Sequence, residues 1–100
     1  MFNLKNMHFV YVIYNTATKK YYVGQTQCVN IRFKEHKTGK NYSTKFKCEY
    51  WNLVYVEMYV SKKDALTRER KLKAHGSGMV EIKKRIINSV DQLNLKLERE

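Results

Sequence analysis

Hydrophobic and aromatic side chains gather in three short runs, at residues 9–14, 21–24 and 51–59. Runs of this length that are rich in Val, Ile, Tyr and Phe are typical of β-strands, and the polar stretch between the first two predicts an antiparallel hairpin. Because side chains alternate between the faces of a strand, the hairpin could place Tyr11 beside Tyr22, although the pattern leaves the register open. The third run is almost continuously apolar, which predicts a central or covered strand.

After the hairpin, apolar residues spaced four apart predict a helix over residues 29–37. Thr26 or Gln27 lies near its expected start, and Gly39 follows its expected end. Residues 38–50 are polar and basic, and we expect a loop or a broken helix there.

Two further helices are predicted over residues 62–75 and 79–87. Ser61 and Asp64 resemble a capping box at the start of the first. Residues 89–100 combine a helix-start signal with alternating leucines, and we favour a helix. These elements predict a small α/β sandwich of the α+β type, in which a three-stranded antiparallel sheet is flanked by helices.

Glu69 falls on the apolar face of the helix predicted over residues 62–75, between Ala65 and Leu72. A carboxylate in that position needs a partner, because burying an unpaired charge is expensive. The partner could be a nearby basic side chain, as in an ion pair with Lys73, or a metal ion.

Charge is the strongest bulk signal, since 20 Lys and Arg against nine Asp and Glu give a formal net charge of +11. This excess favours a polyanionic partner, with nucleic acid ahead of an anionic membrane surface, and the interleaved aromatic residues favour nucleic acid further. An inert basic surface is the alternative.

The length predicts one domain over residues 1–100, with a core at about 7–87 and a tail at 88–100. The apolar runs are too short to span a membrane, and the first residues lack the long apolar core of a signal peptide. We therefore expect a cytoplasmic protein.

The two cysteines, Cys28 and Cys48, have no CxxC spacing. A zinc site that combined them with two of His8, His36 and His75 is possible. Free thiols in a reducing compartment are the favoured interpretation.

Arg32 and His36 are four residues apart and share one face of the first predicted helix. Projecting from a short helix just after a tyrosine-bearing strand, they could converge on a phosphate. The alternative is a solvated basic face.

Taken in order, the segments 9–11 (FVY) and 22–24 (YVG), followed by a helix with an arginine and a histidine and by a later helical glutamate, resemble the GIY-YIG nuclease superfamily, most closely its small stand-alone branch. The resemblance spans roughly residues 7–85. Phe9 stands where the first motif has glycine, valines replace both isoleucines, and no counterpart of a late asparagine found in some members is identified. The ordered set that carries the resemblance is Tyr11, Tyr22, Arg32, His36 and Glu69.

The resemblance implies hydrolysis of phosphodiester bonds with one divalent metal ion, Mg²⁺ or Mn²⁺. Glu69 would then be the metal ligand, since a hard cation can combine one carboxylate with water and phosphate oxygens. Arg32 would hold the scissile phosphate, because its planar guanidinium matches phosphate oxygens and stays charged.

Tyr11 or Tyr22 would orient or deprotonate the attacking water; we favour Tyr11 as the base and Tyr22 as the partner that orients the phosphate, although the sequence does not separate the two. His36 is a second candidate for proton transfer. Tyr42 would contact the nucleic acid at the edge of the site, with Lys40 and Lys45 beside it.

The expected partner is DNA, duplex or branched. A chain of this length leaves no room for a separate DNA-reading domain, so we expect low sequence specificity and recognition through DNA shape, strand junctions or a partner protein. A non-catalytic nucleic-acid-binding module and an RNA-binding accessory protein are the alternatives, and the oligomeric state is left open.

Overall fold

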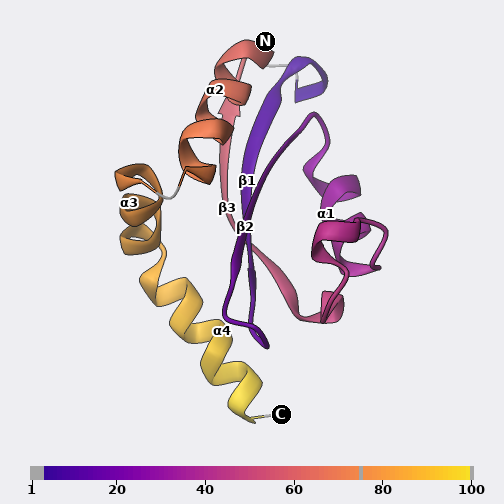
Figure 1. The fold of residues 1–100 in the computed structure, drawn as a ribbon, viewed down its shortest axis with the longest axis vertical. Helices are drawn as coiled ribbons and strands as arrows, with labels where there is room; N and C mark the ends of the chain where they lie inside the picture. The colour runs from indigo at the N-terminus through magenta and orange to yellow at the C-terminus, as the bar shows by residue number, and fades with distance from the viewer. Residues whose placement is uncertain (1–3, 75, 100) are drawn as a thin grey trace.

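The structure is a computed structural model that describes residues 4–74 and 76–99. Three strands form one antiparallel sheet in the order β2-β1-β3, with β1 at His8–Asn15, β2 at Tyr21–Thr26 and β3 at Trp51–Tyr59 (Figure 1). The predicted hairpin and the predicted sheet are confirmed, and each strand lies within two residues of its expected bounds.

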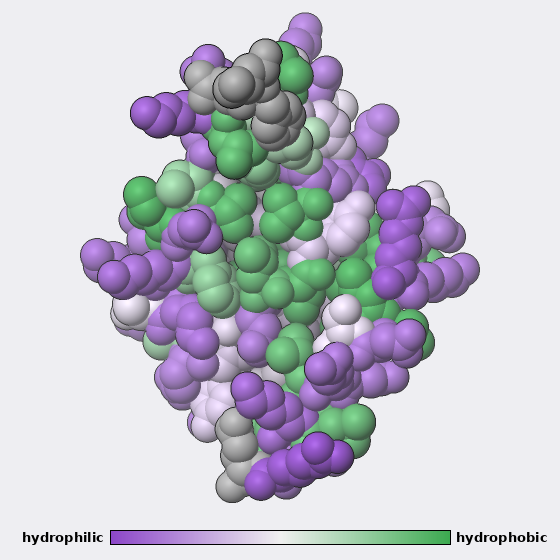
Figure 2. Space-filling view, turned by 180° about the vertical axis from the view of Figure 1, so that it is seen from behind, coloured by the Kyte–Doolittle hydropathy of each residue, from purple (hydrophilic) through white to green (hydrophobic). Residues whose placement is uncertain are grey.

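The central strand is β1, and it is buried from Val10 to Asn15. The prediction that the third strand is central or covered is wrong, because β3 lies at an edge of the sheet. Its apolar side chains Leu53, Val56 and Met58 are each about 40% exposed. Seen from behind, the surface of the molecule carries a gathering of apolar side chains (Figure 2).

Helices cover both faces of the sheet (Figure 1). On one face lies α1, Val29–Lys37, followed by the short 3₁₀ turns η2, Tyr42–Thr44, and η3, Cys48–Tyr50. The other face is covered mainly by α2, Lys62–Lys73, and the chain continues through α3, Ser77–Arg85, and α4, Ile87–Arg99. A further 3₁₀ turn, η1, occupies Leu4–Asn6 before β1.

Alternation along β1 divides the core into two clusters. Val10, Val12 and Tyr14 pack beneath Ala65 and Leu72 of α2. Tyr11 and Ile13 face the α1 side, where Trp51 and Phe33 pack on them. β1 therefore contributes side chains to the hydrophobic core on both faces of the sheet. Each fully buried aliphatic or aromatic side chain stabilises the fold by roughly 1.5–3 kcal/mol.

The ends of α1 follow local side-chain and backbone preferences. Its N-cap is Cys28, so Thr26 and Gln27 lie near its start as predicted, and the Thr26 hydroxyl accepts the Cys28 N–H at 3.1 Å in a tight turn. Gly39 has φ +78, as predicted for the residue after the helix, and the Lys40 N–H donates to the Glu35 carbonyl at 3.0 Å.

The ends of α2 and α3 were only partly predicted. Ser61 is the N-cap of α2 and accepts the Asp64 N–H at 3.4 Å, as predicted. The predicted end at His75 lies outside the described residues, and α2 itself ends at Lys73. The next helix begins at Ser77 and ends at Arg85, two residues earlier at each end than predicted, because the chain turns at the buried Ile86.

The helix favoured for the tail is confirmed as α4, which begins at Ile87 and anchors through the buried Val90. Within the described residues, none of the helices has both the length and the apolar character needed to cross a membrane.

Candidate active site

The hairpin register places Gly24 directly opposite Tyr11. A Cβ atom at Gly24 would collide with the Tyr11 hydroxyl, so the tyrosine ring lies across β2 at the one position that carries no side chain. Tyr22 is opposite Ile13 and lies diagonally from Tyr11 on the same face. The two tyrosines therefore share a face, which the sequence had left open, although they are not directly paired.

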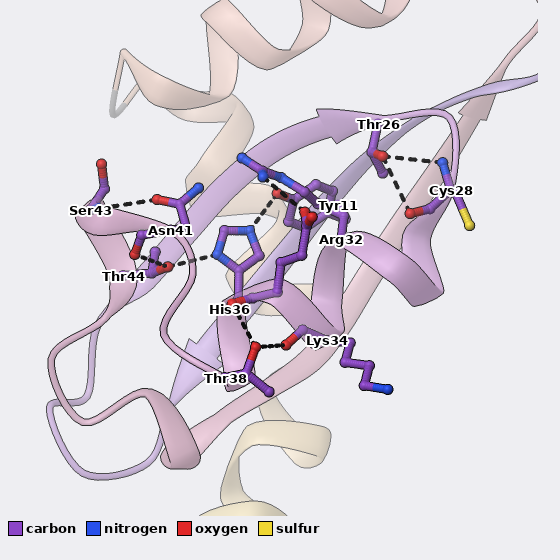
Figure 3. A network of polar contacts seen from close by, with 11 residues as sticks. Tyr11, Thr26, Cys28, Arg32, Lys34, His36, Thr38, Asn41, Ser43 and Thr44 are labelled. Atoms are coloured by element: carbon purple, nitrogen blue, oxygen red, sulfur yellow. Dashed lines mark hydrogen bonds and ion pairs between the residues drawn. The ribbon is translucent and has the colours of Figure 1, made fainter.

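His36 is completely buried and joins Tyr11 to the segment after α1 (Figure 3). Its Nε2 atom lies 2.6 Å from the Tyr11 hydroxyl, and its Nδ1 atom lies 2.7 Å from the Thr44 hydroxyl. The Thr44 hydroxyl donates to the Asn41 carbonyl at 3.4 Å, so it is placed to accept a hydrogen bond from Nδ1–H. In that arrangement the Nε2 lone pair accepts the Tyr11 hydroxyl proton.

The protonation states of this pair follow from their surroundings. Burial, reinforced by the nearby Arg32 charge, lowers the pKa of His36 to about 4, so the imidazole is neutral at pH 7. Burial raises the pKa of Tyr11 to about 12, although a hydrogen bond and the charge of Arg32 act in the opposite direction. Tyr11 is therefore a neutral phenol that donates its proton to a neutral imidazole.

Arg32 lies beside the Tyr11 hydroxyl and is about one-third exposed (Figure 3). Burial lowers the pKa of Arg32, but hydrogen bonds with Tyr11 and Glu35 outweigh it and raise that pKa above its usual range. Its Nη1 atom lies 3.2 Å from a Glu35 carboxylate oxygen. Glu35 therefore holds a permanently charged guanidinium at the mouth of the Tyr11–His36 pair.

Tyr22 forms the second side of the site. The Tyr22 ring centroid lies 5.1 Å from the His36 ring centroid. The ammonium of Lys73, which belongs to α2, lies 5.5 Å from the same Tyr22 centroid. The structure thus brings Tyr11, Tyr22, Arg32 and His36 together on one face of the sheet.

Glu69 reaches the edge of this cluster from α2, and its charge is close enough to raise the pKa of Tyr11 slightly. Its carboxylate lies 3.4 Å from the Lys73 ammonium and its side chain is 18% exposed. This is the ion pair that the sequence left open as the alternative to a metal ion. Among the described residues no three His, Cys, Asp or Glu side chains gather to hold a metal, but a single partly buried carboxylate fits a Mg²⁺ or Mn²⁺ ion that keeps most of its waters.

Tyr42, Lys40 and Lys45 lie outside the buried cluster. Tyr42 is 86% exposed, and the Lys45 ammonium lies 5.4 Å from its ring centroid. Lys40 is exposed just after the end of α1.

The zinc interpretation has no support among the described residues, where no three His, Cys, Asp or Glu side chains gather and both ring nitrogens of His36 have hydrogen-bond partners. His75, which that interpretation also offered as a ligand, lies outside the described residues. Cys28 is exposed and Cys48 is half-buried, and both are free thiols, as favoured.

Two residues of the site were not foreseen, Thr44 and Glu35. Thr44 fixes the tautomer of His36 from a separate turn eight residues later, and no periodic pattern links the two. Glu35 was accessible to prediction, since it is three residues from Arg32 on the same helix.

A protein family and several known proteins match the part of the chain that contains the candidate site. The family model described as the GIY-YIG catalytic domain matches residues 7–79. Proteins named UPF0213 protein from Staphylococcus aureus strains Mu3, Mu50 and N315 are each 34% identical over 68 residues, which is 68% of this chain and 82% of each relative. No solved structure gives a match.

Proposed function

Because the chain belongs to the GIY-YIG family, which is a nuclease-type family, we propose that it is a metal-dependent endonuclease that hydrolyses DNA phosphodiester bonds. The observation that carries the proposal is the buried hydrogen bond of 2.6 Å between Tyr11 and His36, with Arg32 beside it. Weak sequence specificity or recognition of DNA structure is part of the proposal.

The Tyr11–His36 pair supports a proton relay. At pH 7 a phenol with a pKa of about 12 is ionised in only about one molecule in 10⁵, and an imidazole with a pKa of about 4 is a weak base, so the relay would need the charge of Arg32 and of a bound cation to stabilise the hydroxide that it forms. In the relay the Tyr11 hydroxyl takes a proton from the attacking water while its own proton passes to the Nε2 atom of His36. The resulting hydroxide attacks phosphorus, and the bond to the leaving oxygen breaks.

Arg32 supports the phosphate-binding role. Its guanidinium is charged, partly exposed and close to the Tyr11 hydroxyl, so a phosphate bound there would sit next to the relay. The same contact would offset negative charge as it develops in the transition state.

Glu69 is the proposed ligand of Mg²⁺ or Mn²⁺. When bound, the ion would stabilise the negative charge on the leaving oxygen. Lys73 would compete with the ion for the carboxylate, and its ammonium lies near Tyr22, where it can attract a phosphate.

A non-catalytic nucleic-acid-binding module is the second candidate. The ion pair between Glu69 and Lys73 favours it, because a lysine that neutralises the carboxylate makes a metal ion unnecessary for the fold. The net charge of +11 agrees with either candidate.

The test compares wild type with Arg32→Ala and Glu69→Gln on supercoiled plasmid and on a branched oligonucleotide, with Mg²⁺, Mn²⁺ or EDTA. We expect metal-dependent nicking that falls by about 10²–10³ in the Arg32 variant and is lost in the Glu69 variant, with binding retained. Glu81→Gln is the matched control, because Glu81 is an exposed carboxylate paired with Lys84 on α3. Tight binding without cleavage by wild type would instead establish the binding module.

A further inference from the structure

Two aromatic side chains stand out because they are not packed into the fold. Tyr42 is 86% exposed and Phe46 is 73% exposed, whereas every other aromatic side chain among the described residues is buried or half-buried. The two residues are four positions apart from each other, in the segment between α1 and β3. Large apolar groups held in water are commonly found where a partner covers them.

A lysine ammonium lies over each of these two rings. The Lys45 ammonium lies 5.4 Å from the Tyr42 centroid, and the Lys47 ammonium lies 5.8 Å from the Phe46 centroid. An aromatic ring that offers a face for stacking, with a cation beside it for the phosphate, is the combination that binds single-stranded nucleic acid.

The backbone that presents the two rings is anchored. The Trp51 indole N–H donates to the Thr44 carbonyl at 2.8 Å, and the Asn15 amide donates to the Lys47 carbonyl at 2.9 Å. A segment held in this way presents its side chains in place, which lowers the entropy lost on binding.

Phe46 also borders the candidate active site. It lines a hollow of about 240 Å³ together with Tyr22, Thr44 and Trp51. Tyr22 packs against His36, and Thr44 is bonded to it. A base stacked on Phe46 would therefore place its strand next to the proposed site of cleavage.

We propose that Tyr42 and Phe46 form a stacking platform for unpaired nucleobases, so that the site takes a strand at a single-stranded segment or junction rather than within a regular duplex. The inference rests on the proposed function, since the platform serves the same site. Stacking tolerates any base, which agrees with low sequence specificity. The lysine over each ring favours nucleic acid over a protein partner.

The test measures binding in EDTA, so that it does not depend on cleavage. Fluorescence anisotropy gives the affinity of wild type, Tyr42→Ala and Phe46→Ala for a single strand of about 12 nucleotides, within the usual site sizes, and for the matching duplex, at several salt concentrations. We expect each alanine variant to bind the single strand about 5- to 150-fold more weakly, with little change on the duplex.

Salt dependence separates stacking from charge. Removal of a ring should leave the slope of log affinity against log salt unchanged, whereas Lys45→Ala should reduce its magnitude by about 0.7 for the lost phosphate contact. Phe46→Trp should retain binding, and Leu95→Ala, which truncates a 53% exposed side chain on α4, should change nothing.

Equal losses on single strand and duplex would overturn the proposal, and so would the absence of loss in both alanine variants with unchanged melting temperatures. The second outcome is the one expected if the rings bind a protein instead. Neither depends on the cleavage assays with Arg32→Ala and Glu69→Gln, so failure of the platform and failure of the nuclease proposal are distinguishable.

Discussion

At the scale of single residues, the site depends on a missing side chain. The Tyr11 ring crosses β2 over Gly24, and any side chain there would displace the hydroxyl from His36. The requirement is steric, because the register and not the backbone conformation of Gly24 puts the two residues in contact.

We therefore predict that Gly24→Ala lowers stability by about 1–3 kcal/mol through overpacking, and that it lowers any cleavage activity more than stability alone explains. Urea unfolding and plasmid nicking measure the two effects. Gly76→Ala is the comparison variant: among the described residues no atom other than those of its neighbours lies within 4 Å of the added Cβ, so its expected cost is only that of alanine at the N-cap of α3. A Gly24 variant with full activity would show that the position of the Tyr11 hydroxyl is unimportant.

His36 predicts a pH dependence of stability. Its pKa of about 4 in the folded protein lies below the ordinary value near 6.5, so the unfolded chain binds more protons between these values. The stabilisation is complete above about pH 6.5 and is lost as the pH falls towards 4, by up to the order of 3 kcal/mol.

The measurement is the free energy of unfolding of wild type and His36→Gln between pH 7 and pH 5. Glutamine does not titrate, so the advantage of wild type should shrink as the pH falls. A difference that stays constant over this range would mean that His36 is not the group responsible.

Residue types were more accessible from the sequence than their contacts. The sequence identified Tyr11, Tyr22, Arg32 and His36, which the structure gathers on one face. It could not show that His36 is fully buried and neutral, because that depends on Thr44 and on the packing of α1 against β1.

At the scale of elements, the placement of α2 depends on a polar cluster that no sequence pattern revealed. Arg68 donates two hydrogen bonds of 2.8 Å to the two carboxylate oxygens of Glu57 on β3, and Tyr55 and Tyr59 donate to the same carboxylate. Burial raises the pKa of Glu57, but the bonds from Arg68 and both tyrosines outweigh it and lower that pKa to about 2. Because Arg68 precedes Glu69, this cluster also fixes where the candidate metal ligand lies.

We predict that Arg68→Met destabilises the protein by about 3 kcal/mol, because it leaves the largely buried Glu57 carboxylate without its charged partner. Arg70→Met, on the exposed side of the same helix, should cost less than about 0.5 kcal/mol. Thermal and urea unfolding of both variants provide the measurement. Equal effects would mean that the Glu57–Arg68 contact contributes little.

The elements themselves were largely predictable, because period, caps and turn residues agree locally. The exceptions were tertiary. The edge position of β3, which leaves Leu53, Val56 and Met58 partly exposed, depends on the order in which the strands pair. The turn at Ile86 between α3 and α4 contains no Gly or Pro from which it could be predicted.

At the scale of the whole molecule, charge and aromatic exposure coincide on the segment between α1 and β3. Lys45 and Lys47 lie over the two exposed rings there, and Thr44 of the same segment is bonded to His36 of the candidate site. Two of the 20 basic residues thus lie over exposed rings next to the candidate site. A sequence reports the excess but not this arrangement, which depends on the turn that returns the chain to β3.

The central position of β1 also predicts how fast the amide hydrogens near Tyr11 exchange with solvent. Since β1 is paired on both sides and buried on both faces, its amide hydrogens should exchange with solvent only when the whole domain opens. Tyr11 thus stands on the strand whose amide hydrogens we expect to exchange most slowly. The hydroxyl that we propose as the start of the proton relay would therefore keep its place on β1 through any local opening elsewhere in the domain.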